Sequence, residues 1–155
     1  MKNDSGLTNL GTLIIICSII IIIILAVRFI NLQYMNEEIE TIKTNMLLVQ
    51  GKAKIILEEK NALKSELKGI NASEKREDEN IKKILEANVI GEDNIKDWYL
   101  FNEETLNEIG LDFVYTEEGV YIVNYSKQDV IYLLGANSDE KTIYKLSDLT
   151  TKIKK

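Results

Sequence analysis

An uninterrupted apolar run near the N-terminus constrains this 155-residue chain more than any other feature. From Leu10 to Val27 there are 18 consecutive uncharged residues, nine of them isoleucine. An α-helix rises 1.5 Å per residue, so about 20 apolar residues cross a hydrocarbon core of about 30 Å. The run therefore predicts a transmembrane helix over residues 7–30. It is too long for a cleavable secretory signal and is not followed by a small-residue cleavage site, so we expect a retained membrane anchor in contact with the lipid bilayer.

The orientation of this predicted anchor depends on its flanking charges. Lys2 and the α-amine lie on the N-terminal side, and Arg28 and Lys43 lie on the C-terminal side, which is close to balance. A short N-terminal tail with a translocated C-terminal domain is the simpler topology for a single span. We therefore expect a single-pass protein of the cell membrane whose N-terminus is cytoplasmic and whose C-terminal domain is extracytoplasmic.

Beyond residue 30 the apolar pattern changes but continues. Apolar residues recur with alternating spacings of four and three, which is a heptad pattern. The chain contains no proline, so nothing in its composition interrupts a helix here. We expect the anchor helix to continue to about Lys68, roughly 60 residues and roughly 90 Å in all. The predicted interaction stripe consists of Met35, Ile39, Ile42, Met46, Val49, Ala53, Ile56, Leu63 and Leu67.

The stripe allows two kinds of packing. A strict heptad seam suits a coiled coil with another chain, either a second copy or a different protein, whereas a broader apolar face suits packing on a domain of the same chain. The residues that broaden the middle of the stripe are Leu47, Leu48, Ile55 and Leu57. Both interpretations predict that the long helix is the main interaction element.

The remainder predicts a small domain of the α+β class. Short β-branched and aromatic runs at Trp98–Phe101, Phe113–Tyr115, Val120–Tyr125 and Val130–Leu134 are typical of strands, with a further strand expected at Thr142–Leu146. The last three of these four runs predict a three-stranded antiparallel meander that the strand at Thr142–Leu146 would extend to four, with one face on the long helix and the other partly covered by aromatic residues. The predicted divisions are a polar leader at 1–6, the membrane helix at 7–30, the amphipathic helix at 31–70, a second helix at 71–90 and the sheet domain at 91–155.

Three smaller signals mark helix ends in this region. Asn71 and Glu74 have the spacing of a capping box, and Gly69 is placed to end the preceding helix. Asn102 is a capping residue for a short helix that ends at Gly110, and a last helix is expected from Ser147 to Lys155.

The composition argues against catalysis. The chain has no histidine and one cysteine, so the usual general base and the usual zinc-ligand clusters are missing. It has no phosphate-binding glycine loop and no nucleophile elbow. We therefore predict no catalytic residue, cofactor, metal site or small-molecule substrate. Beyond Ile30 there are 17 basic and 24 acidic side chains, a net charge of −7, which disfavours a nucleic-acid partner.

The N-terminus resembles that of a known family. A polar leader ends in Gly6 and is followed by Leu7, Thr8 and an apolar helix that continues as an amphipathic one before a small antiparallel sheet. This arrangement is similar to type IV prepilins and type II secretion pseudopilins. The resemblance implies cleavage between Gly6 and Leu7 and assembly of subunits through their long helices. The chain departs from the family at the fifth mature position, where Gly11 replaces the usual glutamate, and in its leader, where Asp4 and Ser5 replace basic residues.

Two functional hypotheses follow. The first is a membrane-anchored, pilin-like structural protein that assembles or interacts through its long helix. The alternative is a bitopic coiled-coil scaffold of the cell envelope, of the divisome type, with a small extracytoplasmic interaction domain. Neither requires enzymatic activity.

Overall fold

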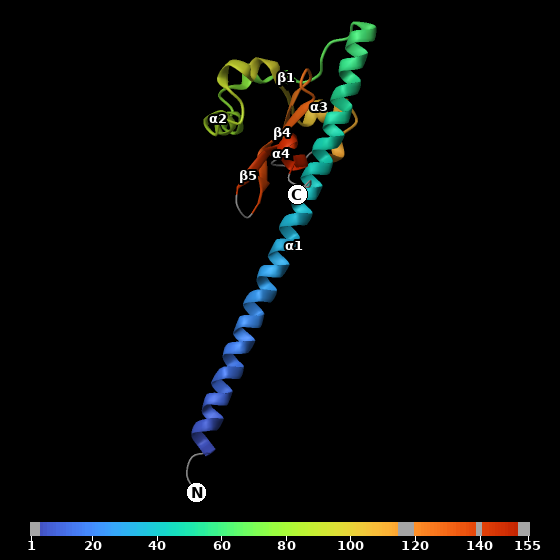
Figure 1. Ribbon diagram of the computed structural model, residues 1–155. Helices are drawn as coiled ribbons and strands as arrows, with labels where there is room; N and C mark the ends of the chain where they lie inside the picture. The colour runs from blue at the N-terminus through green and yellow to red at the C-terminus, as the bar shows by residue number, and fades with distance from the viewer. Residues whose placement is uncertain (1–3, 115–119, 139–140, 152–155) are drawn as a thin grey trace. The chain divides into compact units, whose positions relative to one another are not determined.

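The computed structural model describes residues 4–114, 120–138 and 141–151 (Figure 1). The chain divides into two compact units, Met1–Glu37 and Glu38–Lys155. Helix α1 runs from Asp4 to Leu63 and supplies all the described structure of the first unit. The second unit takes in residues of α1 from Glu38 onward together with everything that follows, so it is larger than the sheet region alone.

The second unit is α+β, as predicted. After α1 come β1 (Ile70–Asn71), the 3₁₀ helix η1 (Ala72–Lys75), α2 (Glu79–Glu86), the 3₁₀ helix η2 (Glu92–Asp97), β2 (Tyr99–Phe101), α3 (Glu103–Glu108), the 3₁₀ helix η3 (Asp112–Val114), β3 (Tyr121–Asn124), β4 (Asp129–Asn137), β5 (Thr142–Lys145) and α4 (Leu146–Thr151). The strands form one antiparallel sheet in the order β1-β2-β3-β4-β5. Each strand therefore pairs with its neighbour in the sequence.

The two faces of the sheet are covered by different elements, which form layers on either side of it (Figure 1). Alternation along β3 sends Tyr121 and Val123 to one core and Ile122 to the other. The first core, which we call the α1 core, joins the sheet to α1, α3 and α4. The second core, the α2 core, lies under α2, η1 and η2. Burial on both faces explains why β3 is apolar without polar alternation.

The face opposite α1 is partly covered by aromatic residues, as predicted, since Trp98 and Tyr144 pack in the α2 core. Isoleucines of α2 and η2 supply most of the remaining cover. Other aromatic residues, among them Tyr121 and Tyr132, lie on the α1 side. Tyr121 and Tyr132 are directly opposed in the register of β3 and β4, and their ring centroids are 5.3 Å apart. The two tyrosines therefore pack against each other as a cross-strand pair.

Helix α1 ends at Leu63, not near Lys68 as predicted. The next residue, Lys64, has a φ of 57°, which is a left-handed conformation that stops a helix. The chain must then reach the sheet, where Ile70 pairs with Leu100 in the short strand β1, an element that the sequence did not predict. The Tyr125 hydroxyl donates a hydrogen bond of 2.8 Å to the Lys68 carbonyl, so tertiary contacts hold this segment outside the helix.

The predicted helix over residues 71–90 is also divided. Asn71 does cap a helix, since its Oδ1 accepts from the Ser73 amide at 3.0 Å, but that helix is the short η1. The α-helix begins only after Asp78, whose carboxylate accepts from the Asn80 amide at 2.9 Å and the Ile81 amide at 3.3 Å. Asp78 competes with the capping box because its side chain can satisfy two free amides at once.

The predicted strand at Phe113–Tyr115 is wrong within the described part, since Asp112–Val114 forms η3, while Tyr115 lies outside the described residues. The end of α3 explains this. Gly110 has a φ of 73°, and the Leu111 amide donates to the Leu106 carbonyl at 2.7 Å, which is a Schellman turn at the predicted end of this helix. This turn buries Leu111 beside Leu106 and continues directly into the tight turn of η3.

Candidate interaction surface on helix α1

The N-terminal part of α1 is an apolar surface with no cover from the chain itself. Between Leu13 and Ile30 the large aliphatic side chains are about half exposed or more. The helix is long and apolar enough to cross a membrane, and none of its most apolar window is buried. This exposure, in a chain whose other large aliphatic residues are mostly buried, suggests a membrane anchor. Cys17, the single cysteine, lies within this surface.

The predicted processing site lies at the start of the same helix. Gly6 and Leu7 both fall within α1, which begins at Asp4. The expectation of a separate polar leader at residues 1–6 concerns residues of which only 4–6 are described. Cleavage after Gly6 stays a prediction.

The interaction stripe is mostly used inside the second unit. Its middle five residues, Ile42, Met46, Val49, Ala53 and Ile56, are buried in the α1 core against the sheet. At the edges of the unit, Ile39 is half-buried against the same core, and Leu67, beyond the end of α1, is also packed against it. Met35 is half-buried, and Leu63 is 76% exposed. The stripe therefore joins α1 to its own domain over four helical turns.

Two polar contacts accompany the packing of the stripe, one from the middle of its buried segment and one from beyond the end of α1. The Gln50 amide nitrogen donates to the Gln128 carbonyl at 2.5 Å, and Lys68 forms an ion pair with Glu108 on α3 at 2.5 Å. The Glu108 carboxylate raises the pKa of Lys68, first through this hydrogen bond and then through its charge. Both groups of the ion pair are exposed, so its contribution to stability is small.

Burial also changes the tyrosines that line the α1 core. It raises the pKa of Tyr121 to about 12, and it raises that of Tyr125 further. The Tyr121 hydroxyl donates to the Val114 carbonyl at 3.2 Å, so both tyrosines use their hydroxyls within the fold. These side chains are packing groups with satisfied polar atoms.

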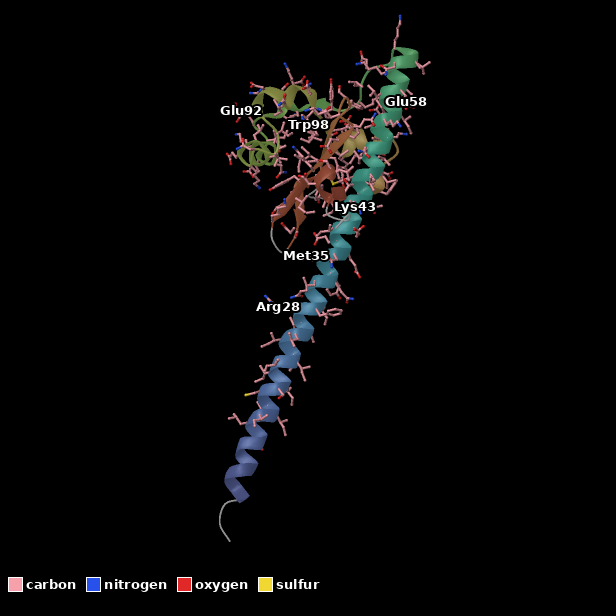
Figure 2. All side chains as sticks on the ribbon, viewed as in Figure 1. Arg28, Met35, Lys43, Glu58, Glu92 and Trp98 are labelled. Atoms are coloured by element: carbon pink, nitrogen blue, oxygen red, sulfur yellow. The ribbon has the colours of Figure 1, made fainter. Side chains whose placement is uncertain are left out.

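A second apolar set on α1 lies outside the α1 core. Leu47, Leu48 and Ile55 are 43%, 41% and 48% exposed, and Gly51 lies among them. Figure 2 shows the dense side chains between α1 and the sheet, while the labelled Glu58 lies on the outer side of the helix. The sequence identified Leu47, Leu48 and Ile55 only as a broadening of the stripe. Placing these residues around the helix at about 100° per residue would have shown that they form a second face.

The described residues of the second unit form shallow depressions in at least two places. One is lined by Leu47, Gln50, Lys127, Gln128, Leu146 and Thr150. Another lies between the end of α2 and β5, at Asn88, Lys141, Tyr144, Lys145 and Asp148. Within residues 4–114, 120–138 and 141–151 no three histidine, cysteine, aspartate or glutamate side chains gather as a metal site would need.

Comparisons of the chain with protein-family models, with curated proteins and with solved structures give no match. Evidence on function therefore comes from the residues and the fold alone.

Proposed function

We propose that this chain is a single-pass, membrane-anchored structural protein of pilin-like design that acts without catalysis. In this proposal the N-terminal part of α1 lies in the bilayer, with the N-terminus cytoplasmic and the sheet domain extracytoplasmic. The long helix serves assembly or interaction with other subunits.

One observation carries the proposal. A single helix, α1, is uniformly apolar and exposed in its N-terminal part and forms one wall of a compact α+β domain in its C-terminal part. A soluble helix would bury its apolar residues or surround them with charge, and this helix does neither over more than 18 residues. A membrane is the environment that removes the free-energy cost of exposing these apolar side chains to water.

The burial of the stripe bears on the two hypotheses. A coiled-coil scaffold built on the stripe would have to separate Met46 and Val49 from the sheet, and both are fully buried. A pilin-like design uses that face of the helix for its own domain. Structural assembly would then depend on the membrane segment and on the outer face of α1.

Alkaline carbonate extraction followed by N-terminal sequencing tests this proposal on the protein in its native membrane. We expect the full chain to stay in the membrane pellet, and we expect its sequence to begin at Leu7 if the resemblance to prepilins extends to processing. Release of the chain into the supernatant would contradict the anchor. An intact Met1 in cells that contain the prepilin peptidase would contradict pilin-like processing alone.

A further inference from the structure

The outer face of α1 has an apolar patch that the fold of the chain does not use. Successive helical residues are separated by about 100°, so Leu48, Gly51 and Ile55 project about 150° away from the buried stripe. Leu47 lies at the edge of this face, where it also lines the depression beside Gln128 and α4. A Cβ atom added to Gly51 would have no atom within 4 Å, so the helix backbone is open to close approach there. We call these four residues the outer patch.

The charges beside the outer patch are arranged for a parallel partner of identical sequence. Leu48 and Ile55 are seven residues apart with Gly51 between them, which is the spacing of a heptad seam. In that register Lys54 directly precedes the seam position Ile55. Glu59 directly follows the next seam position, which is Glu58. In a parallel, in-register pair of helices, residues so placed face each other across the contact with an offset of five. Lys54 of each copy therefore meets Glu59 of the other.

Neither Lys54 nor Glu59 forms a salt bridge among the described residues, and the charge of Glu59 acts on Lys68 only as a minor contribution that raises its pKa. The three salt bridges found among the described residues are Lys43 with Glu40, Lys68 with Glu108 and Lys82 with Glu77. Lys54 and Glu59 are both exposed on the surface of α1. A second copy would supply an opposite charge to each of them at two symmetric places.

We propose that the outer patch binds a second copy of this chain, with the two α1 helices parallel and in register and with Lys54 paired to Glu59 in both directions. The contact is short, because Glu58 occupies the next seam position and would repel its equivalent. It rests on the proposed function in one respect: a shared membrane holds both copies parallel and raises their effective concentration.

Site-specific crosslinking of the full chain tests the contact. In a Cys17→Ser background, Ile55→Cys places a thiol in the outer patch, and Lys60→Cys places one at an exposed position about 140° around the same helix. With a short bis-maleimide reagent in phosphatidylcholine vesicles, we expect the dimer yield at Ile55 to exceed that at Lys60 about tenfold, or ~1.4 kcal/mol. Equal yields at the two positions would overturn the proposal.

A charge exchange tests the register. Lys54→Glu in the Ile55→Cys chain should lower the dimer yield about fivefold, because two attractive pairs become repulsive. Adding Glu59→Lys to that chain restores opposite charges and should restore the yield. Both positions are exposed, so the fold is not at risk. A double variant that crosslinks no better than Lys54→Glu would overturn the in-register arrangement.

Flotation of the same samples with the vesicles separates this inference from the proposed anchor. Chains that float but crosslink equally at both positions would retain the anchor and refute the dimer. Chains that do not float but crosslink at Ile55 in solution would support the dimer and refute the anchor.

Discussion

Glycine residues in this chain occupy two opposite situations. Gly51 lies inside α1 with nothing near its missing side chain, and Gly135 lies in β4 with a φ of 74° beside a break in the register between β4 and β5. A Cβ at Gly135 would lie 2.9 Å from Cε1 of Tyr144 and would also collide with Thr142. The first glycine costs the helix stability, whereas the second is required by close approach and backbone angle.

We therefore predict opposite effects of the same substitution. Gly51→Ala should raise the free energy of unfolding by about 1 kcal/mol, which is the difference in helix propensity. Gly135→Ala should lower it by at least about 1 kcal/mol, since a left-handed φ is strained for alanine and the space is filled. Thermal unfolding of both full-length variants in detergent checks this. A stabilised Gly135→Ala chain would contradict the observed geometry.

The buried phenol of Tyr121 makes stability depend on alkaline pH. Its pKa is about 12 in the folded chain against 10.0 for an ordinary tyrosine, mainly because burial disfavours the charged form. The folded state holds the proton more tightly, so this contribution is complete below pH 10 and is lost as the pH rises through 12. Burial raises the pKa of Tyr125 as well, so its contribution to stability depends on pH with the same sign.

We expect unfolding between about pH 10 and 12 to coincide with tyrosine ionisation. Tyr121→Phe removes one ionising group, so its alkaline midpoint should move to higher pH, even though loss of the hydrogen bond to Val114 costs stability at neutral pH. Circular dichroism and tyrosinate absorbance, recorded on the same titration, provide the measurement. Tyr34→Phe, at an exposed position, is the matched control and should leave the midpoint in place.

Helix α1 presents two apolar faces outside the predicted membrane segment, and they differ in burial. Met46 is completely buried against the sheet, while Leu48, two residues later, is 41% exposed. The sequence shows both as apolar and cannot tell which face the domain covers. The difference depends on which side of the helix the sheet occupies, and that is decided by long-range packing.

Alanine substitutions at these two positions should separate the faces. Met46→Ala should lower the free energy of unfolding by about 2–5 kcal/mol, because it leaves a cavity in the α1 core. Leu48→Ala should change it by less than about 0.5 kcal/mol, as expected at an exposed site. Urea unfolding of the two full-length chains in the same detergent gives the comparison. Similar losses for both would mean that the helix docks differently.

Individual elements differ in how well the sequence predicted them. The α3 cap at Asn102 and the turn at Gly110 were predicted because the capping chemistry is local, and both are present. The ends of α1 and α2 were predicted less well. There a distant contact decides the outcome: Tyr125 holds the Lys68 carbonyl, and the pairing of Ile70 with Leu100 draws the chain away from the helix.

At the scale of the whole molecule, the sequence divides clearly between an uncharged N-terminal helix and an acidic remainder. The apolar run, the α+β class and most of the strands were readable because each depends on periodicity or composition. The α2 core could not be predicted from the sequence, because its isoleucines on α2 and η2 meet Trp98 and Ile122 only after the chain has folded. The sequence identified apolar residues of the outer patch, but it did not predict that they form a face separate from the stripe.

A change of charge tests the membrane proposal on the whole chain. Ile20→Lys combined with Ile21→Lys should sharply lower the fraction of protein that resists carbonate extraction, since each lysine near the centre of a membrane helix costs about 3 kcal/mol. The control, Asn61→Lys with Ala62→Lys, adds the same charge at exposed positions outside the apolar run. Equal extraction of both double variants would contradict a span at this position.

The burial of Met46 and Val49 against the sheet also sets where the chain can be divided. The residues that would ordinarily count as a stalk supply part of the hydrophobic core, so the α+β domain has no independent beginning at Ile70. A protease that releases a folded domain must cut before Ile39. A cut nearer Leu63 would leave the sheet without one wall and would release an unfolded fragment.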